Sequence, residues 1–467
     1  METDAAASPI ERRHRVVLDL QACQTEDSRH RGIGRYSSSL AEALTGSETG
    51  FDYAIAVNDA FRDSAAEIER RFETRPGVRQ IVRYAATTPS GPWTPGVVDA
   101  GRIAGEWIAQ YAWTAQKPDI VHVGSLFEGS TGRAVVPDLV GLPSSTVVCA
   151  TAYDLIPLVE AERYLVDGRT RAWYQSRIQR LSRCDLLLAI SDATRRDLIA
   201  RLGIPEARVV SIQGGVGKRF CAADASSARA EEFARSLGIV QPYVMYTGGI
   251  DYRKNLEATI RAFGLLPDPL RRGHQLAIVC SASDADRARL LGVAKSAGLA
   301  PGVVVLTGFV PDEVLVDLYR RCRLFVFPSS YEGFGLPVLE AMACGAPTIA
   351  ANRSSLPEIV GRADALFDVG SDEAIAGAIA HALASPGFLR ELAAYGVERA
   401  KQFTWDRVAG RTRDAWLDAL GRKCRSAVIA PRQRPRMALV SPLLPERSGV
   451  AEFVTAFLPY LARHFRI

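Results

Sequence analysis

The sequence lacks the features that mark secreted, membrane-spanning and nucleic-acid-binding proteins. Its 467 residues contain no apolar run of transmembrane length, and the polar stretch 1–15 has no apolar core for a signal peptide. The formal net charge of +5 is small for this length, so charge gives no reason to expect a nucleic-acid partner. We therefore expect a cytoplasmic protein in which residues 1–15 form a disordered leader.

Paired metal-binding residues are also missing. The eight cysteines are scattered singly, several of them inside apolar segments, which is typical of reduced thiols in the cytosol. Asp284 and Asp286 have the spacing of an Asp-x-Asp metal motif, but they lie in a polar loop and helix start, where solvated helix caps are the simpler interpretation. We expect neither a metal nor a cofactor.

What is present is an ordinary globular composition with two series of short apolar segments. Hydrophobic residues make up 48% and charged residues 23%, and the length predicts two domains. The first series of expected strands is Val16–Leu20, Tyr53–Val57, Val78–Tyr84, Ile120–Val123, Ser145–Thr151 and Leu186–Ile190. The second is Tyr243–Tyr246, Gln275–Val279, Val303–Leu306, Leu324–Phe327, Thr348–Ala351 and Ala365–Phe367. Helical patterns separate most of these strands, which predicts an α/β fold with parallel sheets.

The two series predict two Rossmann-like domains, at 16–225 and 238–402, that face each other across a ligand cleft. A helix at 403–421 is expected to return to the first domain. Residues 422–436 contain six Lys/Arg and two prolines, which favours a linker, although such a basic strip could also touch anionic lipid in a peripheral membrane association.

The last segment, 437–467, repeats the strand–loop–helix order of residues 16–44. We interpret it as the truncated start of a second module. The alternative is a strand and helix that dock on the first domain.

The stretch Arg323–Gly345 has the pattern of a ligand site. A buried strand is followed by a glycine-rich loop at 331–335, and Pro337 stands at the first position of a helix. The free N–H groups of a helix start attract anions, and glycines allow a ligand to approach closely. Glu332 and Glu340 therefore flank an expected phosphate site at the carboxyl edge of a strand.

A second candidate loop follows the strand Tyr243–Tyr246. After the glycine turn, Arg253 and Lys254 lie over the carboxyl edge that also carries Glu332. Cations at this position would neutralise a pyrophosphate and stabilise its departure. Either residue alone is more often a solvated surface charge, but the adjacent glycine turn favours a functional role.

A glycine pair also opens a helix in the first half. The loop Gly32-Ile33-Gly34 either cradles a phosphate or only turns the chain. A nicotinamide dinucleotide site would need these glycines directly after the strand, and they come about twelve residues late. Asp59, after the second expected strand, keeps this alternative open. Further along, a helix carrying Trp107 and Trp113 predicts core packing rather than a membrane or acceptor contact.

Taken together, these motifs resemble the retaining glycosyltransferases of family 4, which have the GT-B fold. GGIDYRKNLE, PSSYEGFGLPVLEAMACGAP and SSLPEIVG carry the resemblance, and the two glutamates separated by seven residues are its most specific feature. RGIGRYSSSLAEAL, KPDIVHVGSLFEG, AYDLIPL, LLLAISDATRRDL and FTWDRV extend it over nearly all of residues 16–421. The sequence is most similar to bacterial polysaccharide enzymes, especially mannosyltransferases of the O-antigen type, some of which carry two modules.

The resemblance implies a role for each matching residue of the donor site. Glu332 would hold the hydroxyls of the donor sugar, Glu340 would bind the ribose, and Lys254 with Arg253 would bind the leaving pyrophosphate. The remaining residues implied at the donor site are Gly32, Gly34, Gly249, Phe309, Val310, Phe334, Gly335 and Leu336, with Ser354, Ser355 and Glu358 nearby. Phe309 and Val310 fall where such enzymes hold the nucleobase.

Two residues depart from the family pattern. Gly249 stands where many relatives have an arginine, and Tyr153 where many have a histidine. Asp154 is then the candidate for positioning the sugar or acceptor, although a carboxylate that caps a turn is an equal alternative. Tyr153, His122 and Glu128 are further acceptor-side candidates, and His122 also fits simple packing.

The resemblance implies a retaining, metal-independent hexosyltransferase that moves mannose from GDP-mannose to a saccharide or lipid-linked saccharide acceptor. It would act in the cytoplasm or at the inner face of the plasma membrane. Two alternatives stay open: a sugar-nucleotide epimerase or hydrolase on the same fold, and an inactive sugar-nucleotide-binding module of a two-module protein.

Overall fold

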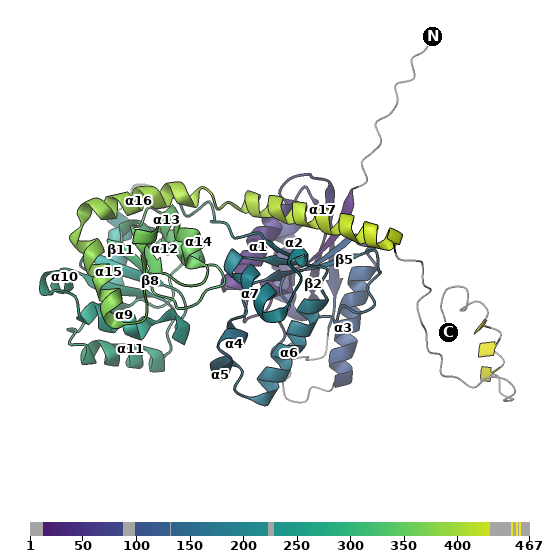
Figure 1. Cartoon of the computed structure of the whole chain (residues 1–467), viewed down its shortest axis with the longest axis horizontal. Helices are drawn as coiled ribbons and strands as arrows, with labels where there is room; N and C mark the ends of the chain where they lie inside the picture. The colour runs from purple at the N-terminus through teal and green to yellow at the C-terminus, as the bar shows by residue number, and fades with distance from the viewer. Residues whose placement is uncertain are drawn as a thin grey trace, which may run out of the picture. The chain divides into compact units, whose positions relative to one another are not determined.

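The computed structural model describes residues 13–86, 99–130, 132–222 and 228–429, and a few helical residues at 450–451, 454–455 and 457–458 (Figure 1). The chain divides into two compact units, 1–416 and 417–467. The first unit contains two parallel sheets and the site described below. The second contains the end of the long helix α17 (Trp405–Ile429).

The first sheet has seven strands in the order β3-β2-β1-β4-β5-β6-β7, all of them parallel. The strands are β1 (His14–Asp19), β2 (Phe51–Asn58), β3 (Val78–Tyr84), β4 (Ile120–Val123), β5 (Val147–Ala152), β6 (Leu186–Ala189) and β7 (Val209–Ser211). The α-helices of this part are α1 (Gly32–Thr45), α2 (Arg62–Phe72), α3 (Asp99–Thr114), α4 (Ile156–Val159), α5 (Ala161–Tyr164), α6 (Gly168–Arg183) and α7 (Asp192–Leu202).

The second sheet has six parallel strands in the order β10-β9-β8-β11-β12-β13. The strands are β8 (Tyr243–Thr247), β9 (Gln275–Val279), β10 (Val304–Leu306), β11 (Leu324–Phe327), β12 (Thr348–Ala351) and β13 (Leu366–Phe367). The helices are α8 (Ala228–Ser236), α9 (Leu256–Gly264), α10 (Asp268–Arg272), α11 (Asp284–Ser296), α12 (Asp312–Arg321), α13 (Leu336–Ala343), α14 (Leu356–Val360), α15 (Asp372–Ala384) and α16 (Pro386–Ala400).

Most of the strands are nearly continuous apolar runs because helices cover both faces of each sheet (Figure 1), whereas the edge strand β3 also carries exposed polar residues. The predicted α/β architecture with two parallel sheets is therefore confirmed. In each sheet the strand order reverses once, between β1 and β4 and between β8 and β11. Connections leave in opposite directions at such a point, which opens a crevice at the carboxyl ends of the strands.

Two crossover segments join the parts built on the two sheets. The Val216 N–H donates to the Phe403 carbonyl oxygen at 3.0 Å, so the outgoing and returning chains run side by side. Gly215 is needed there, because a Cβ at this position would lie 2.6 Å from the Trp405 nitrogen. The first half of α17 then packs on the first sheet, with the buried Trp416 ring 5.6 Å from Phe51 and 5.5 Å from His122.

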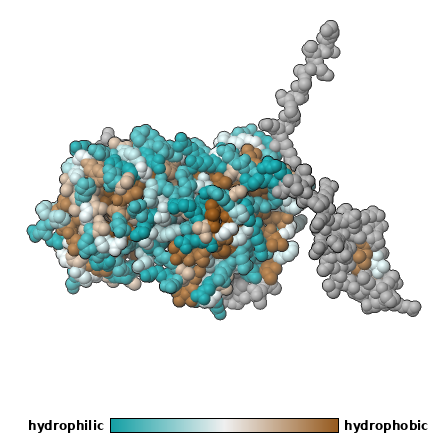
Figure 2. Space-filling view, viewed as in Figure 1, coloured by the Kyte–Doolittle hydropathy of each residue, from teal (hydrophilic) through white to brown (hydrophobic). Residues whose placement is uncertain are grey.

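The two tryptophans of α3 differ in burial. Trp113 is fully buried in the core, as expected, whereas Trp107 is 69% exposed. The prediction of core packing was therefore wrong for Trp107. Hydrophilic side chains cover most of the face seen in Figure 2, with smaller hydrophobic patches between them. No helix within the described ranges combines the length and the apolar character that crossing a membrane requires.

Some expected boundaries were wrong. The predicted linker at 422–436 begins inside α17, which continues to Ile429 because the lysine, arginine and alanine residues of its last turns favour helix. The predicted leader at 1–15 ends earlier, since β1 begins at His14. In the expected second module, residues 450–451, 454–455 and 457–458 are helical, and its expected strand lies outside the described residues.

Candidate active site

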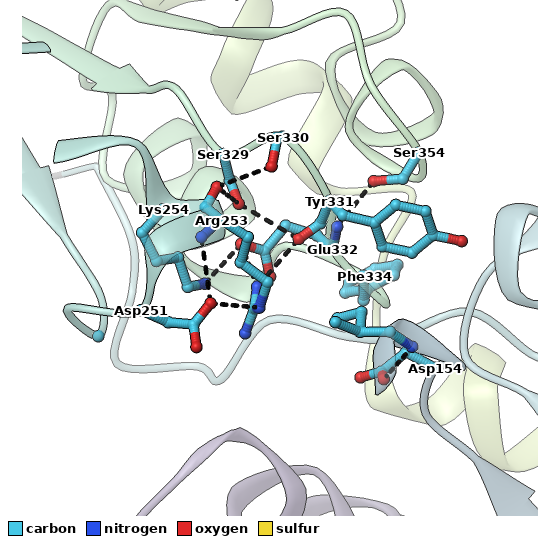
Figure 3. Close-up of polar contacts among 12 residues, drawn as sticks. Asp154, Asp251, Arg253, Lys254, Ser329, Ser330, Tyr331, Glu332, Phe334 and Ser354 are labelled. Atoms are coloured by element: carbon cyan, nitrogen blue, oxygen red, sulfur yellow. Dashed lines mark hydrogen bonds and ion pairs between the residues drawn. The ribbon is translucent and has the colours of Figure 1, made fainter. Parts of the chain in front are cut away.

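The reversal of strand order in the second sheet brings the two candidate loops together. Strands β8 and β11 are paired neighbours, so the segments that follow them leave the sheet side by side. The Arg253 carbonyl oxygen accepts hydrogen bonds from the Ser330 N–H at 2.7 Å and from Ser329 Oγ at 3.1 Å. These bonds hold the Arg253–Lys254 loop against the Glu332 loop (Figure 3).

Local backbone geometry shapes the first loop. Gly248 has φ +148°, and a Cβ there would lie 2.6 Å from Tyr246 Oη, so only glycine fits. Asn255 ends the turn at φ 58°, a conformation that asparagine tolerates better than most residues. The short 3₁₀ helix Tyr252–Lys254 thereby places Arg253 and Lys254 at the sheet edge.

Glu332 lies at the centre of the site. Its Oε1 is 2.5 Å from Lys254 Nζ and 3.0 Å from Arg253 Nη1, and only 8% of the residue is exposed. Burial alone would raise the pKa of Glu332, but the charges of Lys254 and Arg253 outweigh this effect and hold its pKa below the ordinary value. A carboxylate and two cations thus converge at the crevice (Figure 3).

The loop that carries Glu332 is fixed from a neighbouring turn. The Glu332 N–H donates to Ser354 Oγ at 2.8 Å, and Ser355 Oγ donates to the carbonyl oxygens of Glu332 at 3.0 Å and Phe334 at 2.5 Å. Gly335, with φ +116°, is the N-cap that precedes α13. The free N–H groups at the start of this helix are suited to an anion.

Glu340, one turn inside α13, is nearly buried and has two partners. Its Oε1 lies 2.9 Å from Arg35 Nη2 on α1, and its Oε2 accepts a hydrogen bond from Tyr319 Oη at 3.2 Å. Burial raises the pKa of Glu340 to about 7, although the positive charge of Arg35 opposes this shift. Arg35 was not singled out in the sequence, even though it directly follows the Gly32–Gly34 motif.

A cavity of about 900 Å³ opens beside Glu340. Gly34 and Arg35 of α1 line it on one side, and Leu336 and Glu340 of α13 on the other. Glu332, Arg253 and Lys254 do not line this cavity, because their side chains close on one another. The open space therefore lies at the predicted nucleotide end of the site, and the predicted sugar end is filled by the ion pairs.

The predicted donor-site residues of the glycine motifs differ in their constraints. A Cβ at Gly34 would lie 2.4 Å from the Ser28 carbonyl oxygen, so packing within the loop already requires glycine there. Neither Gly32 nor Gly249 has any atom within 4 Å of an added Cβ. Gly32 therefore shows no steric need for glycine, and a longer side chain fits at Gly249.

The remaining donor-site candidates differ in how exposed their side chains are. Phe309 is 80% exposed at the end of β10, whereas Val310 is buried. The Phe309 ring is therefore available for stacking and the Val310 side chain is not. The Phe334 ring is buried, with its centroid 6.1 Å from that of Phe403, so the ring is not open to a ligand.

Asp154, labelled in Figure 3, lies against the loop that carries Glu332, since a Cβ at Gly333 would lie 3.2 Å from the Cβ of Asp154. Its Oδ1 accepts a hydrogen bond from the Ile156 N–H at 3.0 Å, which is the turn cap that we considered as its alternative role. Burial raises the pKa of Asp154, while Arg253 and Lys254 act on it in the opposite sense. The structure thus supports the cap and also places this carboxyl group near the site.

The other acceptor-side candidates lie in packed surroundings instead. His122 is buried against Trp416, with Nε2 2.8 Å from Thr151 Oγ1. Tyr153 Oη is 2.7 Å from Ser37 Oγ, and Glu128 accepts hydrogen bonds from Thr25 and Ser28 in the loop before α1. The structure does not bring these three side chains to Glu332, because each is held by neighbours within the first half of the chain.

Sequence reasoning also missed contacts between the two halves. Tyr164 Oη lies 2.5 Å from Asp251 Oδ1, and Tyr331 Oη donates to a carboxylate oxygen of Asp197 on α7. Glu358 accepts hydrogen bonds from the Asp192 and Ala193 N–H groups at 2.8 and 2.7 Å, at the start of α7. No spacing within the sequence could reveal these pairs, because their partners come from separate domains.

Two family models match the chain. Residues 30–218 match the model described as Glycosyltransferase Family 4, and residues 230–403 match the model described as Glycosyl transferases group 1. Among solved structures, sucrose-phosphate synthase of Thermosynechococcus elongatus has the same fold, with a TM-score of 0.63 at 22% identity over 89% of this chain and 100% of that one.

Curated relatives agree with the models. The serotype-specific mannosyltransferase WbdA of Escherichia coli is 32% identical over 84% of this chain and 47% of that protein, so the chain spans about half the length of this relative. The O-antigen chain mannosyltransferase B of Escherichia coli is 27% identical over 82% of this chain and 95% of that protein. A D-inositol 3-phosphate glycosyltransferase of Salinispora tropica is 30% identical over 78% of each.

The paired parallel sheets define the class of protein as one with the GT-B fold. Within this class, the chain belongs to glycosyltransferase family 4, and the predicted membership is confirmed.

Proposed function

We propose that this chain is a retaining glycosyltransferase that moves mannose from GDP-mannose to a saccharide acceptor, free or lipid-linked, during synthesis of a surface polysaccharide. The observation that carries the proposal is the convergence of Lys254 and Arg253 on the buried Glu332, beside the start of α13. The two cations are placed to meet a leaving diphosphate, and the carboxylate is placed to meet a sugar.

The donor would extend along α13. The ribose would lie at Glu340, which borders the cavity, and the diphosphate at the helix N-terminus beside Leu336. The sugar would then reach Glu332 and displace part of its contact with Lys254. In this arrangement Lys254 leaves the Glu332 carboxylate for the diphosphate. Lys254 thereby exchanges one negatively charged partner for another.

In the reaction, the bond between the anomeric carbon and the diphosphate oxygen breaks, and a bond from the acceptor oxygen to that carbon forms on the same face. The proton of the acceptor hydroxyl passes to a phosphate oxygen. Lys254 and Arg253 stabilise the negative charge that develops on the diphosphate, so the proposal requires no metal ion. Contacts such as Tyr164 with Asp251 keep the two halves together, which would exclude water from the donor.

Mannose is proposed because the two curated relatives from Escherichia coli described above are named mannosyltransferases. The pocket itself favours no particular hexose. A second candidate function is an inactive module that binds a sugar nucleotide, since this chain has Gly249 and Tyr153 in place of the arginine and histidine of many relatives. A hydrolase or epimerase on the same fold is the third.

A screen followed by product analysis tests the proposal. GDP-mannose, GDP, UDP-glucose and dTDP-rhamnose are compared by thermal stabilisation, because a true donor raises the melting temperature by mass action. The stabilising donor is then incubated with and without a mannose-terminated oligosaccharide. We expect an extended, α-configured product only with acceptor. Free mannose or an epimer as the sole product would favour the third candidate, and binding without turnover the second.

A further inference from the structure

Arg35 and Glu340 form an ion pair between the two halves of the first unit. Arg35 lies in the first turn of α1, and its Nη2 is 2.9 Å from Glu340 Oε1 on α13. The two partners differ in exposure, since 39% of the Arg35 side chain is accessible but only 6% of the Glu340 side chain. The guanidinium group also lies 5.8 Å from the Phe220 ring. Arg35 thus reaches the buried carboxylate while part of it still faces open space.

In this ion pair Arg35 occupies the Glu340 carboxylate, which the ribose of the donor is expected to bind. Glu340 already accepts from Arg35 on one oxygen and from Tyr319 on the other. A ribose that binds through its hydroxyls must find acceptor positions on the same carboxylate. Release of Arg35 would provide them, because Tyr319 alone would continue to hold Oε2.

The cavity offers Arg35 another partner. Arg35 and Gly34 line the same cavity as Leu336, the first residue of α13, where the diphosphate is expected. A planar guanidinium binds phosphate oxygens through two parallel hydrogen bonds, as it does a carboxylate. A small rotation of the side chain would therefore exchange a carboxylate for a phosphate without loss of charge pairing.

We propose that Arg35 is a donor-binding residue: it leaves Glu340 for the donor's diphosphate, and Glu340 thereby becomes free to bind the ribose. This inference rests on the proposed function, since it assumes a nucleotide diphosphate in the cavity. It adds a cation from the first half of the chain to the pair Lys254 and Arg253 of the second. The diphosphate would then be held from both sides of the crevice.

Calorimetric titration with GDP and guanosine tests the exchange. The variants are Arg35→Ala, Arg35→Lys, Glu340→Gln and the double variant Arg35→Ala/Glu340→Gln, with Arg79→Ala as the control. Arg79 on β3 is also paired with a carboxylate, Asp52 Oδ1 at 2.8 Å, and its side chain is 45% exposed, close to the 39% of Arg35, but it does not line the cavity. Melting curves of each variant confirm that it is folded.

We expect Arg35→Ala to weaken GDP binding about tenfold or more and to leave guanosine binding unchanged or tighter. The loss for GDP should persist in the Glu340→Gln background, because a phosphate contact does not depend on the carboxylate. Arg35→Lys should retain part of the affinity, and Arg79→Ala nearly all of it.

Equal losses for GDP and guanosine, or a loss for GDP that disappears in the Glu340→Gln background, would show that Arg35 only holds Glu340 in place and would overturn the inference. Full GDP affinity in Arg35→Ala would overturn it as well, while the proposed function stands. If the wild-type chain bound neither GDP nor UDP, ADP or dTDP, the proposed function would fail and the inference with it.

Discussion

Lys254 Nζ lies 2.5 Å from Glu332 Oε1, and this contact joins the two loops that follow the neighbouring strands β8 and β11. Both side chains are about one-tenth exposed. The pair explains why the predicted sugar end of the site is closed in this structure. It also makes Lys254 the residue whose removal should affect stability and catalysis together.

Substitution of Lys254 by alanine leaves Glu332 buried with Arg253 as its remaining cation. Loss of one partner of a buried ion pair typically costs about 3–5 kcal/mol, and we expect the lower end here because Arg253 stays 3.0 Å away. Transfer should fall about 100-fold or more, since charge stabilisation of the leaving group is lost. Urea unfolding and initial rates measure the two effects. Lys295→Ala, an exposed change on α11, is the control and should alter neither.

The pKa of Glu340 predicts a dependence of stability on pH. The folded chain keeps this proton up to about pH 7, whereas the unfolded chain releases it near the ordinary value of 4.5. Between these values the folded state binds more protons, so its stability falls as pH rises. Glu340→Gln should remove about 3 kcal/mol of this decline. Unfolding of both proteins at pH 5 and pH 7.5 measures the difference. Parallel pH profiles would contradict the assignment.

Gly248 and Gly249 provide a matched pair of adjacent positions. Gly249→Arg should fold normally, because nothing lies within 4 Å of an added Cβ, and it should strengthen donor binding severalfold by restoring a cation that many relatives have. Gly248→Ala should destabilise the chain by about 1–3 kcal/mol, since its φ of +148° disfavours a side chain. Melting temperature and GDP affinity test both. A stable Gly248→Ala variant would argue against this loop geometry.

Gly333, in the loop that carries Glu332, lies directly against the first half of the chain. A Cβ at this position would lie 2.3 Å from the Tyr153 carbonyl oxygen, so Gly333→Ala should push the two halves apart. We expect transfer to fall at least about tenfold, because misplacement of the donor by about 1 Å is costly. Gly292→Ala on α11, where an added Cβ meets no atom within 4 Å, is the control. Unchanged transfer in Gly333→Ala would show that this contact is dispensable.

Much of the fold was predictable because most strands of a covered parallel sheet are short apolar runs, while the edge strand β3 mixes apolar and polar residues. Val78–Tyr84, Ile120–Val123, Leu324–Phe327 and Thr348–Ala351 were predicted with the bounds that the structure shows. The C-terminal end of α17 was not predicted, because a basic composition is as typical of a helix as of a solvated linker.

The site was predictable where its residues are close in sequence and less so elsewhere. Glu332 and Glu340 belong to one loop and helix, and Lys254 follows the neighbouring strand, so their spacing indicates a shared edge. Arg35 was missed because its partner lies 305 residues away. His122 was a candidate because it lies near the end of a strand. Its side chain instead packs against Trp416 of α17.

The most direct test of the account is the rate of mannose transfer from GDP-mannose by Glu332→Gln. The exposed Glu232→Gln on α8 serves as the matched control, because it makes the same change of charge outside the site. We predict that Glu332→Gln loses about 100-fold or more of the wild-type rate while GDP binding changes little, and that Glu232→Gln keeps the full rate. Full transfer by a folded Glu332→Gln protein would contradict the central role of this carboxylate.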